Sequence, residues 1–186
     1  MKALAVALSI LIPYCSYPQG VFTNDTHSTL QKVISDYPRF SNIKGQLISE
    51  GPQTTDYSSI VQVPGCLSAI ITRYSSEEDE EIYSWKCVLL STEDFQEATV
   101  KYDEFFKQIS NSIIRIDGQK PFILNGSYIA PTEEKRFNSS AFHLVPATAG
   151  DLKKLKVELT LEFLVTEWKL SLLVYDHTEE NQLAMD

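Results

Sequence analysis

The clearest alternation of polar and hydrophobic positions lies near the end of the chain. Two runs there alternate over most of their length, and the residues of their hydrophobic face are Leu155, Val157, Leu159, Leu161, Phe163, Trp168, Leu170, Leu172 and Val174. Successive side chains of a β-strand point to opposite faces, so a period of two with one hydrophobic face predicts strands of an antiparallel sheet that is covered on one side. A turn near Thr166-Glu167 joins the two runs into a hairpin.

Two other segments show a helical period. In residues 92–112 the hydrophobic positions recur every three or four residues, at Phe95, Ala98, Tyr102, Phe105 and Ile109. This spacing predicts a helix with one apolar stripe, and Ser91 or Thr92 is the expected N-cap. Residues 26–37 show the same spacing, and Pro38 stops that shorter helix.

Shorter alternating runs predict the remaining strands, with turns at Pro64-Gly65 and Asp117-Gly118. The predicted strand segments are 45–49, 57–63, 66–74, 82–90, 122–129 and 137–145. Strands joined by short turns, together with two helices, predict an α+β fold. We expect a largely antiparallel, twisted sheet of about 6–8 strands packed against two helices, at about 26–37 and 92–112. The order of a helix followed by strands repeats after about residue 92, without sequence similarity between the two halves.

The two ends of the chain differ from the middle. Lys2 followed by the apolar residues 3–12 is typical of a signal peptide, so we expect residues 1–20 to be removed on export. Cys15 follows Tyr14, whereas a lipobox requires a small residue there, so a lipid anchor is not expected. We therefore predict a periplasmic or secreted protein with one α+β domain at 21–176 and a polar tail at 177–186.

The acidic composition narrows the classes of partner. The net charge is −9, and removal of residues 1–20 would make it about −10 because that segment holds Lys2 and no acid. A negative protein is repelled by nucleic acid and by anionic membranes, so we expect neither nucleic acid nor membrane insertion of the mature chain. The run 77–81 is entirely acidic and predicts a solvated hairpin tip.

Cys66 and Cys87 would remain after export, and whether they pair depends on strand register. If Ala69 faces Cys87, then Cys66 lies on the opposite face of strand 66–74 and a bridge is excluded. A register shifted by an odd number would bring the two cysteines together but would pair Leu67 with Lys86. We prefer the first register and expect two free, buried thiols, with a Cys66–Cys87 disulfide as the alternative.

The sequence holds no nucleophile elbow, P-loop, dinucleotide fingerprint or zinc-protease motif, so we predict no catalytic residues, cofactor or metal site. His27, His143 and His177 lie far apart along the chain, with no second ligand at metal spacing. The candidate binding residues are the aromatic side chains Tyr83, Trp85, Trp168 and Tyr128, which would line a groove for a sugar or peptide. The alternative is that these rings are ordinary sheet-forming residues.

Several segments resemble a group of uncharacterised exported proteins from Bacteroidota bacteria. They are DYPRFSNIKG (36–45), YSWK (83–86), STEDFQEA (91–98), LKVEL (155–159) and EWKLSLLVY (167–175). The resemblance runs from about residue 26 to 176, and its residues are mostly core and turn positions. It implies the same fold and a periplasmic or outer-membrane-associated location, and it implies no activity.

These observations favour a non-catalytic periplasmic or secreted module that binds another exported protein through the strand edges that an open sheet exposes. One alternative is a carrier of a small apolar ligand. The other is a hydrolase whose site forms only in three dimensions, with His143 or His177 beside a carboxylate.

Overall fold

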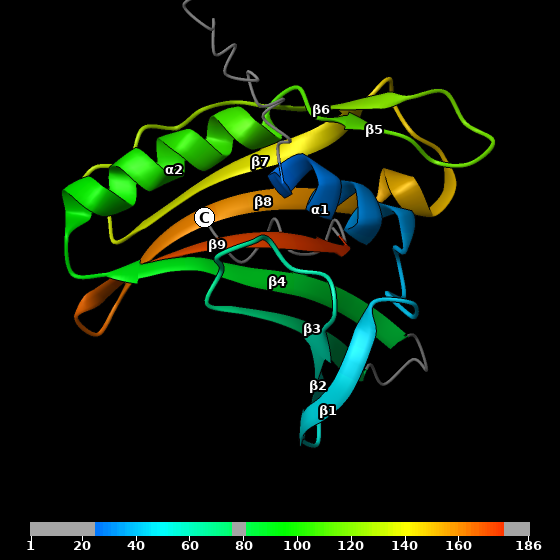
Figure 1. The fold of residues 1–186 in the computed structure, drawn as a ribbon, viewed down its shortest axis with the longest axis horizontal. Coiled ribbons are helices and arrows are strands. Elements are labelled where there is room, and N and C mark those ends of the chain that lie inside the picture. The colour runs from blue at the N-terminus through cyan, green and yellow to red at the C-terminus, as the bar shows by residue number, and fades with distance from the viewer. Residues whose placement is uncertain (1–24, 76–80, 177–186) are drawn as a thin grey trace, which may run out of the picture.

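The computed structural model describes residues 25–75 and 81–176, so the predicted signal segment 1–20, the predicted tail 177–186 and most of the acidic run lie outside the described residues. Nine strands form one antiparallel sheet in the order β1-β2-β3-β4-β9-β8-β7-β6-β5, and two α-helices accompany it (Figure 1). The prediction of a largely antiparallel sheet with two helices is confirmed. The expected strand count of 6–8 is too low.

The helices are α1 (Asp25–Ser35) and α2 (Phe95–Ile109). The strands are β1 (Lys44–Glu50), β2 (Thr54–Ser59), β3 (Ser68–Ser75), β4 (Glu81–Thr92), β5 (Ile113–Ile114), β6 (Phe122–Gly126), β7 (Phe137–Val145), β8 (Leu155–Leu164) and β9 (Glu167–Asp176), and a 3-10 turn, η1 (Gly150–Lys153), precedes β8. The additional strand is β5, which pairs Ile114 with Phe122. Two residues are too few to show a period, so the sequence pattern does not reveal this strand.

Two consecutive meanders build the sheet, and each follows one helix. The strands β1 to β4 follow α1, the strands β5 to β9 follow α2, and the last strand of each half pairs with the other in the middle of the sheet. Both helices lie on the same face of the sheet (Figure 1), and α2 contacts β4, β8 and β9. The sheet twists so strongly that β1 runs across the direction of β8 (Figure 1).

The core lies between the helices and the face of the sheet that they cover. One row of facing side chains crosses five neighbouring strands, and its members are Ile71, Trp85, Val174, Val157 and Phe142. Each of these side chains is almost completely buried. Because burial of apolar area is the main force that stabilises a fold, this row explains why the period-two pattern of the sequence predicts these strands correctly.

The start of α2 differs from the prediction. Asp94 is the N-cap, and its carboxylate accepts hydrogen bonds from the backbone nitrogens of Gln96 at 2.8 Å and Glu97 at 3.3 Å. Ser91 and Thr92 still belong to β4, where they pair with β9. The expected cap at Ser91 or Thr92 is therefore wrong, because strand pairing continues further than the polar residues suggest.

The turn between β8 and β9 holds a strained backbone position. Val165 has a φ of 59° and is almost fully exposed, although a β-branched side chain disfavours this left-handed region. Replacing Val165 with glycine should raise the free energy of unfolding by about 0.5–1 kcal/mol, since relief of strain outweighs the added chain entropy.

Urea unfolding followed by circular dichroism measures this change. Thr166→Gly is the matched control, because Thr166 has no positive φ and its replacement should lower the stability instead. A lower stability for Val165→Gly than for the unchanged protein would contradict the assignment of strain.

Candidate functional site

The two candidate tryptophans lie in the core. Trp85 is fully buried, and its Nε1–H donates a hydrogen bond to Ser59 Oγ at 3.0 Å. The Trp168 ring packs between Phe95 and Phe163, with ring centroids 4.9 Å and 5.0 Å away. Both side chains thus have packing partners inside the protein and present no open ring face to a ligand.

The two candidate tyrosines lie far apart from each other. Tyr128 follows β6, is 42% exposed, and packs against Phe106 of α2 with ring centroids 5.0 Å apart. Tyr83 lies near the start of β4, is buried, and donates a hydrogen bond to Glu81 Oε2 at 2.9 Å. The four aromatic candidates therefore do not line one groove, and Tyr83 lines the polar pocket described below.

The histidine-based hydrolase site has no counterpart in the described residues. His143 is exposed on β7, where its strand partner is Asn125, and His177 lies outside the described residues. Within 25–75 and 81–176, no group of three or more His, Cys, Asp or Glu side chains gathers closely enough to hold a metal ion.

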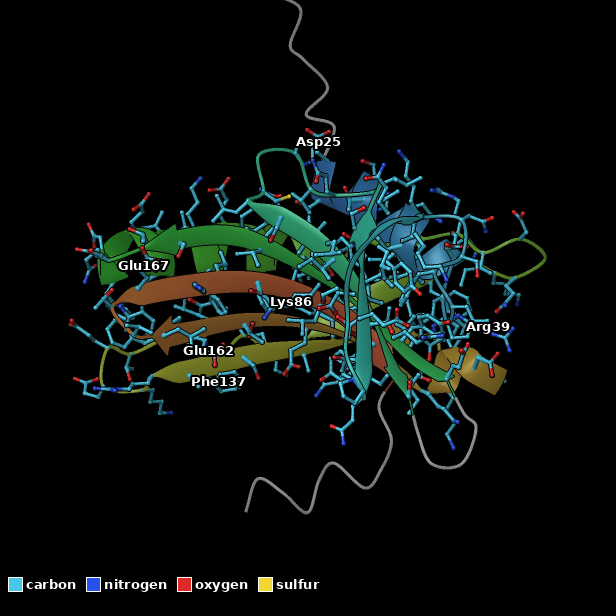
Figure 2. All side chains as sticks on the ribbon, turned by 90° about the horizontal axis from the view of Figure 1, so that it is seen from below. Asp25, Arg39, Lys86, Phe137, Glu162 and Glu167 are labelled. Atoms are coloured by element: carbon cyan, nitrogen blue, oxygen red, sulfur yellow. The ribbon has the colours of Figure 1, made fainter. Side chains whose placement is uncertain are left out.

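A polar pocket opens at the end of the sheet where β4 begins and β9 ends; we call it the Tyr37 pocket. Its volume is about 440 Å³, and its lining residues are Tyr37, Pro38, Arg39, Glu81, Ile82, Tyr83, Asp151, Lys154 and Asp176. Figure 2 shows Arg39 at one end of the sheet and Glu167 at the other end. The pocket therefore gathers side chains from the loop after α1, from both central strands and from η1 and the residue that follows it.

The carboxylate of Asp36 organises the loop that forms one wall of the Tyr37 pocket. It accepts hydrogen bonds from the backbone nitrogens of Asn42 at 2.7 Å and Ile43 at 3.0 Å. Phe40 has a φ of 50° and inserts its ring completely into the core. These contacts hold the loop against the fold while the neighbouring Arg39 remains exposed.

Charge and burial shift the pKa values of three groups in the Tyr37 pocket. The hydrogen bond from Tyr83 and the Arg73 guanidinium 3.1 Å away lower the pKa of Glu81. Burial raises the pKa of Tyr83. Burial also raises the pKa of Asp176, whose carboxylate accepts a hydrogen bond from the Tyr37 hydroxyl.

The Tyr37 pocket offers both charges to a ligand. Arg39 and Lys154 are exposed at its border, while Asp151, Asp176 and Glu81 supply carboxylates. A second, smaller pocket of about 260 Å³ shares Tyr37, Pro38 and Asp151 with it, and its other lining residues include the apolar side chains Ile34, Ile116, Ala149 and Leu152. The two pockets together suit a ligand with a polar part and an apolar part.

The free edge of the sheet beside this region is β1. It pairs with β2 on one side and with no described strand on the other. Leu47 and Ile48 are 56% and 55% exposed, and Ile60, which follows β2, is exposed as well. Two register shifts interrupt its pairing with β2, between Lys44 and Leu47 and between Leu47 and Ser49. An edge strand that exposes large apolar side chains is a surface that other chains can join.

The start of β1 adjoins the Tyr37 pocket. The Lys44 ammonium lies 4.9 Å from the ring centroid of Tyr57 and 5.3 Å from that of Tyr83, which lines the pocket. The start of β1 and the Tyr37 pocket are therefore neighbours.

The face of the sheet away from the helices carries many polar side chains (Figure 2). Lys86 of β4 and Glu162 of β8 lie on it, and the register pairs Glu162 with Lys169 of β9. The Tyr175 hydroxyl donates a hydrogen bond to Glu158 at 2.6 Å on the same face. Such side chains are solvated or satisfied by each other, so this face does not need a covering layer.

No helix of the described residues is both long enough and apolar enough to cross a membrane. Comparisons of the chain with models of protein families, with curated proteins and with solved structures found no match.

Proposed function

We propose that this protein is an exported, non-catalytic module that binds another exported protein by pairing β1 with a strand of that partner. The observation that carries the proposal is the free edge at β1, where Leu47 and Ile48 are more than half exposed. The apolar residues 3–12 behind Lys2 support the export of the chain.

The physical argument is that an edge strand has backbone donors and acceptors on its outer side that only water satisfies. An extended peptide that adds there forms main-chain hydrogen bonds, and its side chains take up neighbouring apolar surface. Leu47, Ile48 and Ile60 provide that surface at β1. The register shifts of β1 limit its regular length, so we expect the partner to contribute a short segment.

A photo-crosslinker tests where the partner binds. An analogue of phenylalanine that carries a benzophenone replaces Ile48 in one sample and Val100 in a second, matched sample, because Val100 on α2 is also more than half exposed. Irradiation in a native extract should give the same crosslinked protein repeatedly from position 48 and not from position 100. Equal crosslinking from both positions would contradict binding at β1.

Affinity measurements with the identified partner complete the test. The double variant Leu47→Lys, Ile48→Lys should bind about 30-fold more weakly or worse, since it removes two apolar contacts worth about 1–2 kcal/mol each. Val100→Lys should leave the affinity unchanged. Both variants change exposed side chains only, so unchanged melting temperatures verify that the fold is intact. Equal affinity of the double variant and the unchanged protein would overturn the proposal.

A second candidate function is the transport of a small amphipathic ligand in the Tyr37 pocket. The mixed charges of this pocket and the apolar pocket beside it favour such a ligand. Native mass spectrometry of protein purified from its own cells should show a bound molecule that Arg39→Gln releases and Lys107→Gln retains. A mass that equals the polypeptide alone would exclude the carrier function and leave the β1 proposal untouched.

A further inference from the structure

The charged groups that line the Tyr37 pocket differ in whether they already have partners. Glu81 is satisfied, because the Arg73 guanidinium lies 3.1 Å from one of its oxygens and a tyrosine hydroxyl lies 2.9 Å from the other. Within the described residues, Arg39 and Lys154 form no ion pair and no side-chain hydrogen bond. The pocket therefore holds two cations that are available to an anionic group of a ligand.

Three oxygen-bearing groups meet around the Tyr37 side chain. The Tyr37 hydroxyl donates a hydrogen bond to the Asp176 carboxylate and lies 3.2 Å from the backbone oxygen of Asp151. A hydroxyl group has one proton and two lone pairs, so the Tyr37 oxygen can still accept a hydrogen bond. The second carboxylate oxygen of Asp176 accepts no hydrogen bond from the described residues. Together these oxygens can accept the three N–H donors of an ammonium group.

The charge of Asp176 has no partner of opposite sign among the described residues. Its carboxylate is half-buried, and burial raises its pKa with no nearby charge that would lower it. A partly buried charge without a partner is unfavourable, so a cation of the ligand that pairs with it is stabilised there. An ammonium group suits this place better than calcium, which takes about six to eight oxygen ligands.

The apolar pocket of about 260 Å³ adjoins these oxygens, because Tyr37 and Asp151 line both pockets. Ile34, Ile116 and Leu152 contribute to its apolar lining. An apolar group that enters it therefore lies beside the acceptor oxygens. The main pocket of about 440 Å³ is within the range of roughly 300–1,000 Å³ that holds drug-sized ligands, so a peptide of a few residues fits it better than one amino acid.

We propose that the Tyr37 pocket binds short peptides with a free N-terminal ammonium, an apolar first side chain and a free C-terminal carboxylate. The ammonium lies among the oxygens of Tyr37, Asp151 and Asp176, and the first side chain enters the apolar pocket. Arg39 and Lys154 attract the carboxylate. Capture of a free chain end is a recurring mode of peptide recognition. This inference rests on the carrier function proposed above, and it names the class of ligand.

Isothermal titration calorimetry of the full-length protein with leucyl-alanyl-alanine tests the three contacts separately. The N-acetylated peptide removes the positive charge, the C-terminal amide removes the negative charge, and glycyl-alanyl-alanine removes the apolar side chain. Each change should weaken binding about tenfold or more, as the loss of a charge-assisted hydrogen bond or of a buried leucine side chain does. Free leucine should also bind more weakly than the tripeptide.

Three results of this titration would overturn the proposal. One is the absence of binding with the tripeptide at about 1 mM, a concentration at which even a weak specific site is occupied. Another is an equal affinity for the free and the N-acetylated peptide, which would mean that the ammonium is not recognised. The third is an equal affinity for leucine and the tripeptide, which would make the ligand an amino acid.

Two variants that each remove one charge assign the contacts to residues. Asp176→Asn keeps an oxygen for the Tyr37 hydroxyl, and it should weaken the free tripeptide about tenfold while the affinity for the N-acetylated peptide stays the same. Arg39→Gln should weaken the free acid more than the amide. Asp103→Asn is the matched control, because this exposed carboxylate of α2 lies outside the pocket, and it should change neither affinity. Equal losses for the free and the N-acetylated peptide in Asp176→Asn would contradict the place given to the ammonium.

Native mass spectrometry separates a failure of this inference from a failure of the carrier function. A co-purified peptide with an apolar first residue would support both. A co-purified molecule of another class, together with no binding of the tripeptide, would rule out the peptide and leave the carrier function standing. The mass of the polypeptide alone, together with no binding of the tripeptide, would rule out both.

Discussion

Replacing Trp85 with alanine is expected to lower the free energy of unfolding by about 4 kcal/mol. The side chain is fully buried, and it stands between Ile71 and Val174 in the row that crosses five strands. Removal of the indole leaves a large cavity within this row, and neighbours that belong to the paired strands β3 and β9 cannot move far to fill it.

Trp85→Phe separates packing from hydrogen bonding at this position. Phenylalanine retains most of the apolar area but removes the Nε1–H that donates to Ser59 Oγ, so we expect a loss of only about 1–2 kcal/mol. Urea unfolding followed by far-ultraviolet circular dichroism gives both values without depending on tryptophan fluorescence. Equal losses in the two variants would contradict the central role of the indole in packing.

Replacing Asp36 with alanine is expected to lower the free energy of unfolding by about 2 kcal/mol. The variant removes the acceptor of two backbone hydrogen bonds, from the nitrogens of Asn42 and Ile43. We expect the effect to extend to the Tyr37 pocket, because the same loop carries Tyr37 and Arg39.

Hydrogen exchange tests whether the loss of these hydrogen bonds also loosens the loop beside the Tyr37 pocket. The amides of residues 37–43 should exchange faster in Asp36→Ala, while those of β8 and β9 should keep their protection. Asp103→Ala is the matched control, because it removes an exposed carboxylate of α2 that pairs with the exposed Lys107, and it should cost less than about 0.5 kcal/mol. Unchanged exchange across residues 37–43 would contradict the role given to Asp36.

The parts of the fold that a sequence pattern can predict are those with one buried face. The strand predicted at 137–145 has the bounds Phe137–Val145, and each end of the two hairpin strands lies within two residues of the predicted run. In these strands the buried residues alternate with exposed or half-buried ones over most of their length, so the period is long and regular. The stripe of α2 is visible for the same reason.

The other strand boundaries depend on contacts between residues far apart in the sequence, which a local pattern of polar and apolar residues does not reveal. The predicted strand 57–63 corresponds to β2, which lies at Thr54–Ser59. The prediction extends too far because Ile60 and Val61 are apolar, although they do not belong to a strand. Cys66 was placed in a strand that begins two residues later. In both cases the local composition resembles a strand, and the turn that precedes β3 decides where pairing begins.

The candidate site was even less visible in the sequence. Tyr37, Glu81 and Asp176 come from three distant segments, and they meet only because β4 and β9 pair in the middle of the sheet. Each of the three is an ordinary residue at the end of an element when it is read alone. The exposure of Leu47 and Ile48 likewise depends on β1 being the last strand of the sheet, and an alternating pattern does not give strand order.

The central pairing of β4 with β9 has a consequence for the timing of folding during synthesis. A ribosome makes β4 well before it makes Glu167–Asp176, so the edge of β4 that pairs with β9 has no neighbour until β9 has been made. Neither half can complete its interior before then, and pairing between such distant segments is slow. We therefore expect the two halves to close over their common core only after β9 has been made.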